Sequence, residues 1–172
     1  TDITDGADLY DFEGYKIYRA TDFEFNDAYN ITDGDGNPTF LEPYVQNGVR
    51  AQWDLIDGKS GWHPVDLNGI KFYLGDETGL VHSYVDNNVV NGQRYYYAVV
   101  SYDYGGDLTN NIIPSDSPMK LRVNPLTGAV SLGPNVVEVV PSPPSAGFVD
   151  ASFTGDQIDH VAGASSGEVY LL

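Results

Sequence analysis

Closely spaced acidic residues are the part of this sequence best suited to binding chemistry. Two clusters bring them together: Asp2, Asp5, Asp8 and Asp11 in the first, and Asp33, Asp35 and Asn37 in the second. Hard divalent cations take several oxygen ligands, and short acidic loops provide such ligands at close spacing. Both clusters are therefore candidate calcium sites. The alternative is that they are ordinary carboxylates of solvated turns.

The second cluster begins like the calcium loop of an EF-hand, with oxygen-bearing side chains at alternate positions. However, Pro38 stands where such a loop requires glycine, and Tyr44 stands where it requires a bidentate glutamate. The segment is thus not an EF-hand. We expect Ca²⁺ as a bound ion at most, and no required cofactor.

Three aromatic residues, Trp53, Trp62 and Tyr73, offer a second kind of chemistry. Aromatic rings of this kind can stack on pyranose faces, so these residues are candidates for binding carbohydrate. They can equally form a small hydrophobic core of their own segment, because large aromatic side chains are mostly buried.

Signals for catalysis are weak. His63, His82 and His160 are scattered without metal-ligand spacing, and there is no cysteine to complete a zinc site. The sequence contains no Gly-x-Ser-x-Gly elbow and no phosphate-binding glycine loop. Nothing marks one carboxylate pair above the others as a glycosidase pair. We therefore expect no enzyme and no catalytic residue.

Composition narrows the class of protein further. The 172 residues carry a formal net charge of −17, a field that repels phosphate backbones and argues against nucleic-acid binding. The hydrophobic fraction of 41% is enough for a core, and no apolar run reaches the roughly 18 to 20 residues of a membrane span. The chain starts at Thr1 without a signal peptide, as a mature or proteolysed fragment would. The acidity suits a secreted or cell-surface protein.

The elements that must position these residues are strands, because Tyr, Gly and Pro are abundant and the period of the apolar pattern is two. In segment 14–19, Tyr15 and Ile17 share one face, with Tyr18 on the wetter side. Segments 81–86 and 93–102 are predicted to form a hairpin through Asn91-Gly92, and the second strand should be central and covered on both faces. Further strands are expected over 49–55, 69–74, 119–123, 129–132 and 136–140.

A proline-rich segment divides the chain. Residues 141–147 read Pro-Ser-Pro-Pro-Ser-Ala-Gly, a stiff linker of the kind that separates modules. We therefore expect a β-domain over 1–140. Residues 148–172 are too few to bury a core alone and should form a partial β-module or a strand-donating tail.

Two segments carry a resemblance to a known family. Asp-Phe-Glu-Gly-Tyr-Lys-Ile-Tyr-Arg at 11–19 and the run from Val90 through Tyr-Tyr-Tyr-Ala-Val-Val-Ser-Tyr to Asp103 resemble strands C and F of fibronectin type III-like modules. Such modules occur in large secreted, Bacteroidetes-like bacterial surface proteins. The resemblance implies an immunoglobulin-like β-sandwich in which Tyr95 pins a tyrosine corner by bonding to backbone upstream, and Tyr97 and Val99 point into the core.

The sequence departs from that family in two ways. Residues 20–80 form a long insertion between the two matching strands, and only thirteen residues precede Gly14, where the family has its first two strands. The resemblance therefore implies that other protein chains, from the same parent protein or from neighbouring subunits, complete the sheet by strand pairing.

These observations favour a non-catalytic structural or adhesive module of an extracellular bacterial surface protein. Two alternatives stay open: a carbohydrate-binding module with glycan partners, and an accessory fragment of a secreted hydrolase.

Overall fold

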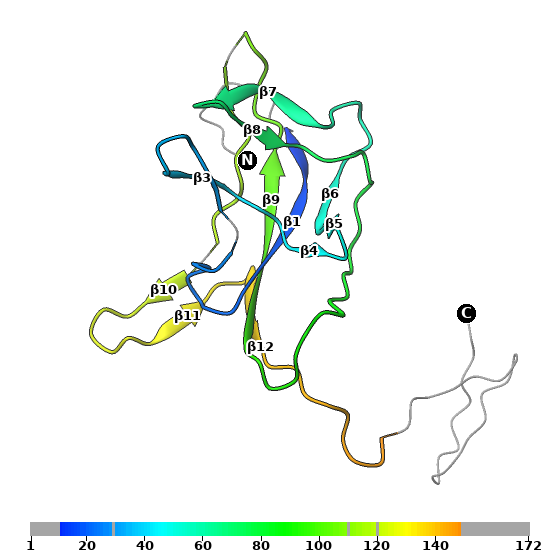
Figure 1. Ribbon diagram of the computed structural model, residues 1–172, viewed down its shortest axis with the longest axis vertical. Coiled ribbons are helices and arrows are strands. Elements are labelled where there is room, and N and C mark those ends of the chain that lie inside the picture. Colours follow the sequence, from blue (N-terminus) through cyan, green and yellow to red (C-terminus); the bar gives the residue numbers. More distant parts are fainter. Residues whose placement is uncertain (1–10, 29, 110, 120, 149–172) are drawn as a thin grey trace, which may run out of the picture. The chain divides into compact units, whose positions relative to one another are not determined.

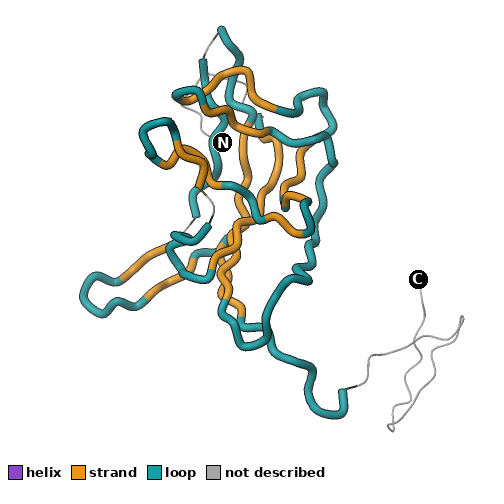
Figure 2. Tube along the Cα trace, in the orientation of Figure 1, coloured by secondary structure: helices purple, strands orange, loops and turns teal. Residues whose placement is uncertain are grey.

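The computed structural model describes residues 11–28, 30–109, 111–119 and 121–148 (Figures 1 and 2). This part of the chain contains strands, turns and loops and no helix, so the all-β prediction is confirmed. It therefore also has no helix long and apolar enough to cross a membrane. The strands are β1 (Phe12–Ala20), β2 (Asn30–Thr32), β3 (Pro38–Leu41), β4 (Val45–Gln46), β5 (Val49–Arg50), β6 (Gln52–Asp54), β7 (Trp62–Leu67), β8 (Ile70–Tyr73), β9 (Tyr95–Asp103), β10 (Leu121–Val123), β11 (Val130–Leu132) and β12 (Val136–Val139).

Strand β9 lies near the middle of a four-stranded antiparallel sheet in the order β12-β9-β1-β6. The longest pairing joins β1 to β9, with Ile17 opposite Val99 and Tyr18 opposite Ala98. The remaining strands form two-stranded sheets, β2 with β3, β4 with β5, β7 with β8 and β10 with β11. The central position predicted for the strand that contains Tyr97 is confirmed, but the expectation that both of its faces are covered is wrong, because Val99 is 48% exposed.

The predicted hairpin between 81–86 and 93–102 is wrong. Residues 81–94 contain no strand, and β9 pairs instead with β1 and β12. The turn at Asn91-Gly92 is present, with Gly92 at φ 82°. Its N–H donates to the carbonyl of Pro141 at 2.8 Å, so the turn is held by a segment distant in sequence.

The four-stranded sheet has two unlike faces. On the first, which we call the covered face, lie the buried side chains Lys16, Tyr18, Ala98, Val100 and Tyr102. On the second, the open face, Tyr15, Ile17 and Tyr97 are half-buried and Val99 is 48% exposed. The expectation that Tyr18 lies on the wetter side, and that Tyr97 and Val99 point into the core, is wrong: the core lies against the other face.

Two parts of the chain pack on the covered face: the insertion 20–80 and the residues that follow β9. Phe23, Phe25 and Leu41 pack against Tyr18 and its neighbours, as do Met119, Leu121 and Leu132 around β10 and β11. Near Tyr102, the covering residues are Phe72, Leu74, Phe40 and Tyr104. Apolar side chains from the described part of the insertion 20–80 therefore form much of the core.

Gly14 shows how closely the strands approach. A Cβ at this position would collide with the backbone carbonyl of Trp53 and with the ring and hydroxyl of Tyr102. The β1–β9 ladder is also irregular between Phe12 and Gly14. Glycine is required here because the space is filled by a neighbouring strand.

The chain divides by its internal contacts into two units, Thr1–Ser142 and Pro143–Leu172. In the second unit the structure describes residues 143–148, where the N–H of Phe148 donates to the carbonyl of Ser145 at 2.9 Å. The partial module expected over 148–172 lies, apart from Phe148, outside the described residues.

Candidate functional site

The loop with Asp33, Asp35 and Asn37 is a turn between β2 and β3 that is closed by its own hydrogen bonds. The carboxylate of Asp33 accepts hydrogen bonds from the backbone N–H groups of Asn37 at 2.9 Å and of Asp35 at 3.0 Å. These bonds, led by that from Asn37, hold the pKa of Asp33 below its usual value. The arrangement accounts for the spacing without a cation.

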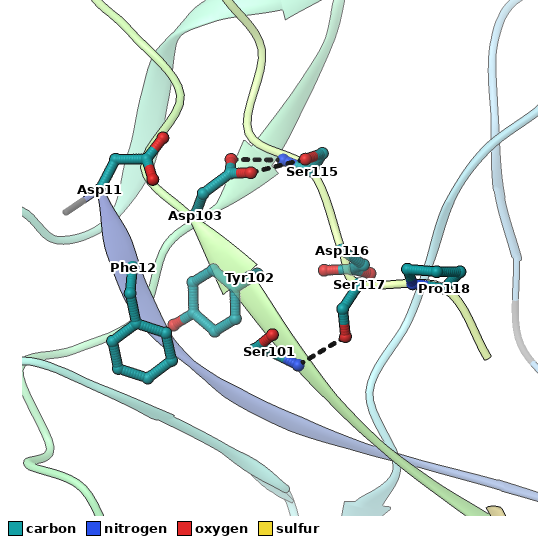
Figure 3. A pocket seen from close by; sticks show the side chains of 9 residues that line it. All are labelled: Asp11, Phe12, Ser101, Tyr102, Asp103, Ser115, Asp116, Ser117 and Pro118. Atoms are coloured by element: carbon teal, nitrogen blue, oxygen red, sulfur yellow. Dashed lines mark hydrogen bonds between the residues drawn. The ribbon is translucent and has the colours of Figure 1, made fainter. Parts of the chain in front are cut away.

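Of the first acidic cluster, Asp2, Asp5 and Asp8 lie outside the described residues. Asp11 lines a cleft of about 390 Å³ at the ends of β1 and β9 (Figure 3). Two further aspartates line it, and both have protein partners: Asp103 accepts from the hydroxyl of Ser115 at 2.6 Å, and Asp116 bonds to Lys16 at 3.2 Å. Within the described ranges, no three acidic or histidine side chains are arranged to hold a metal ion.

The same cleft contains three serines but no serine triad. Ser117 accepts a hydrogen bond from the backbone N–H of Ser101 at 3.0 Å, and Ser115 bonds to Asp103 (Figure 3). A nucleophilic serine needs a base that is oriented by a third group. The residues lining this cleft include no histidine, lysine or cysteine. The cleft therefore offers hydroxyl and carboxylate oxygens to a ligand.

Of the three candidate carbohydrate-binding residues, the fold places only two in one cleft. Trp62 is 56% exposed and packs on Tyr73, with ring centroids 5.0 Å apart. Trp53 packs instead on Tyr84, at 5.4 Å. Trp53 and Tyr73 nevertheless line one cleft of about 320 Å³ together with Arg50.

Asp86 joins the open face to the segment before β9. Its carboxylate accepts hydrogen bonds from Arg19 and from the Tyr97 hydroxyl, each at 2.8 Å, and from Tyr44 at 3.2 Å. Burial acts to raise its pKa, but the bonds from the N–H of Asn88, Tyr97 and Arg19 outweigh burial and hold the pKa low. Sequence reasoning missed Asp86, because its partners lie on three separate strands or loops.

A second buried aspartate network lies on the covered face. Asp116 accepts hydrogen bonds from the ammonium of Lys16 and from the Tyr18 hydroxyl. The ammonium also lies 3.6 Å from the ring centroid of Phe72 and 4.6 Å from that of Tyr102. Burial lowers the pKa of Lys16 to about 8, while Asp116 acts in the opposite direction. The charged side chain thus serves as a core residue.

Glu13 is the one fully buried acid of the described chain whose carboxylate oxygens both lack a partner. Burial raises its pKa to about 7, and the neighbouring carboxylates of Asp57, Asp54 and Glu77 act in the same direction. Lys59 opposes them. No sequence pattern marks Glu13, because its burial results from the loops that fold over the end of β1.

The residues expected to be structural lie on the open face. The Tyr95 hydroxyl accepts a hydrogen bond from the backbone N–H of Val90 at 3.0 Å, the upstream contact that the resemblance implied. Tyr95 is buried, whereas Val99 and Val137, which lies opposite Tyr97 in β12, are 48% and 52% exposed. An apolar row therefore crosses the open face.

Comparison with protein-family models, with curated proteins and with solved structures found no match for this chain.

Proposed function

We propose that this chain is a non-catalytic structural or adhesive module of an extracellular bacterial surface protein and that it acts through contacts with other polypeptides. The observation that carries the proposal is the open face, where Val99 and Val137 are half-exposed on a sheet whose other face buries most of its side chains. Sheets bury an apolar face against a second layer. An open apolar face therefore favours a function in protein contact.

The strand order supports the fibronectin type III-like form of this proposal. In immunoglobulin-like sandwiches one sheet contains strands G, F and C, and C′ can extend it beyond C. The order β12-β9-β1-β6 corresponds to G-F-C-C′, with the matching segments 11–19 and 90–103 as C and F. The bond between Tyr95 and Val90 fits a tyrosine corner at the start of strand F.

A photo-crosslinking amino acid placed at Val99 tests this function in the secreted parent protein. Crosslinks from this position to another polypeptide segment, mapped by mass spectrometry, are the expected result. Leu126, 93% exposed at the tip of the β10–β11 hairpin, is the matched control. Equal crosslinking at both positions, or none at Val99, would overturn the proposal.

A carbohydrate-binding function is the second candidate, supported by one observation. Trp53 and Tyr73 line the same cleft, and Arg50 and Asp76 add polar groups to it. Its volume of about 320 Å³ lies at the lower end of the range of small-molecule sites. Binding on a glycan array that is lost in Trp53→Ala, and retained in Trp62→Ala, would support this candidate; no binding would remove it.

A further inference from the structure

The segment 80–86 lies over the open face as a loop between β8 and β9 (Figures 1 and 2). Two of its side chains anchor it: Tyr84 packs on Trp53, and Asp86 bonds to Arg19 and Tyr97. Val85, between them in sequence, is 68% exposed. The segment therefore has one side fixed to the sheet and an apolar residue directed away from it.

The backbone of this segment is largely unpaired. Within the described part of the chain, no backbone–backbone hydrogen bond involves residues 80–86. The carbonyl of Val85 accepts a bond from the side-chain amide of Gln46 at 3.1 Å, and the N–H of Asn87 donates to the same side chain at 2.8 Å. The segment is thus held in place by side chains, and apart from the Val85 carbonyl its backbone groups have no hydrogen bond within the described part of the chain.

Free backbone groups beside an apolar face are what an added strand requires. Unpaired N–H and C=O groups template pairing with another chain, and side-chain pockets at alternate positions give the pairing its specificity. Here the apolar surface is provided by Val99 and Val137, with half-buried Ile17 beside them.

We propose that segment 80–86 pairs with an extended segment of another polypeptide, whose alternate apolar side chains cover the open face at Val99 and Val137. This inference rests on the proposed function, because it names the partner of the same face. The net charge of −17 makes a second copy of this chain an unfavourable partner and favours basic residues. The partner segment that fits best has alternating β-branched residues flanked by Lys or Arg.

The test uses a synthetic peptide in which valine and threonine alternate between terminal pairs of lysines. Amide hydrogen exchange of the whole chain is measured with and without this peptide. We expect exchange at residues 80–86 to slow by about tenfold or more on binding, because their N–H groups become hydrogen-bonded to the peptide. A tenfold slowing corresponds to about 1.4 kcal/mol of protection. The control is the same peptide with alternate backbone amides methylated, which removes the donors of the ladder.

Two substitutions locate the binding. Val85→Asp and Val99→Asp should each weaken peptide binding by about tenfold or more, since each would bury an unpaired carboxylate against the valine side chains of the peptide. Leu126→Asp adds the same charge on the β10–β11 hairpin and should leave binding unchanged. Circular dichroism verifies that each variant is folded.

Three results would overturn the inference: no binding of the alternating peptide, binding without protection of residues 80–86, or a native mass of two copies in the absence of peptide. The last would assign the open face to a second copy. Crosslinking of Val99 to another polypeptide without protection of 80–86 would refute strand pairing and leave the proposed function standing.

Discussion

The covered and open faces of the four-stranded sheet use the same strands in different ways. Val99 and Val100 are neighbours in β9, yet Val99 is 48% exposed and Val100 is 1% exposed. Both faces carry apolar and aromatic residues, so composition does not separate them. Among the described residues, the difference lies in what covers each face: hairpins and loops pack on the covered face, whereas the segment around Tyr84 and Asp86, with Tyr44, reaches only part of the open face. A period-two pattern therefore defines two faces and leaves open which is the core.

Charged side chains follow the same division. On the covered face, Lys16 is enclosed by two aromatic rings and Asp116. On the open face, Arg19 keeps 19% of its side chain exposed while it bonds to Asp86. The carboxylates are exposed in the reverse order, Asp116 at 22% and Asp86 at 8%, so the two pairs differ mainly in how deeply the cation is buried. Loss of the carboxylate should cost more where the cation left behind is the more deeply buried one, at Lys16.

Substitution of the two adjacent valines gives the largest expected difference between the faces. Val100→Asp should cost about 4 kcal/mol or more, because it buries a charge without a partner. Val99→Asp should cost about 0.5 kcal/mol in the isolated chain, as surface substitutions do. Urea unfolding followed by tryptophan fluorescence measures both. Similar losses in the two variants would contradict the assignment of the faces.

Removal of the two aspartates should give the next largest effect. Asp116→Ala leaves the ammonium of Lys16 buried without its carboxylate and should cost about 3 kcal/mol. Asp86→Ala removes bonds to groups that reach solvent and should cost about 1 kcal/mol. Thermal unfolding of the two variants at equal ionic strength checks this order. A costlier Asp86→Ala would show that the open face holds the fold together.

Glu13→Gln should raise the free energy of unfolding by about 2 kcal/mol at neutral pH. The pKa of Glu13 rises from 4.5 to about 7 in the folded chain. Between these values the folded chain keeps a proton that the unfolded chain releases, so the contribution of Glu13 to stability falls as pH rises. Unfolding free energies at pH 5 and pH 7.5 measure this, with the exposed Glu24→Gln as control. An unchanged pH dependence in Glu13→Gln would refute it.

Tyr95→Phe should have a small effect, a loss of about 1 kcal/mol, because it removes one hydrogen bond from the N–H of Val90 and leaves the ring in place. Hydrogen exchange at Val90 should become faster. The paired control is Tyr97→Phe, which removes the bond to Asp86 and should leave exchange at Val90 unaltered. Faster exchange at Val90 in both variants would contradict a local role for Tyr95.

Much of the β-structure could be predicted from short-range pattern. Alternation located β1 and β9, and turn residues located the hairpin of β10 and β11, where Leu121 lies opposite Leu132. The segment 81–86 was wrongly predicted as a strand: its alternation resembles one, but within the described residues its backbone pairs with no other strand. The site residues were harder to predict. Asp86 bonds to Tyr44, 42 positions away, and Asp116 bonds to Lys16, 100 positions away. Glu13 depends on burial by loops distant in sequence.

The sequence by itself determined that this chain is all-β, strongly acidic and built around two tyrosine-rich strands, because residue type, charge and period act over a few neighbouring positions. Only the tertiary structure decided which face of those strands is core. Lys16 is polar in isolation, yet it is buried because Phe72, Tyr102 and Asp116 surround it from three other segments. Burial depends on which other segments pack against a strand, and the alternation of residues within the strand does not determine that.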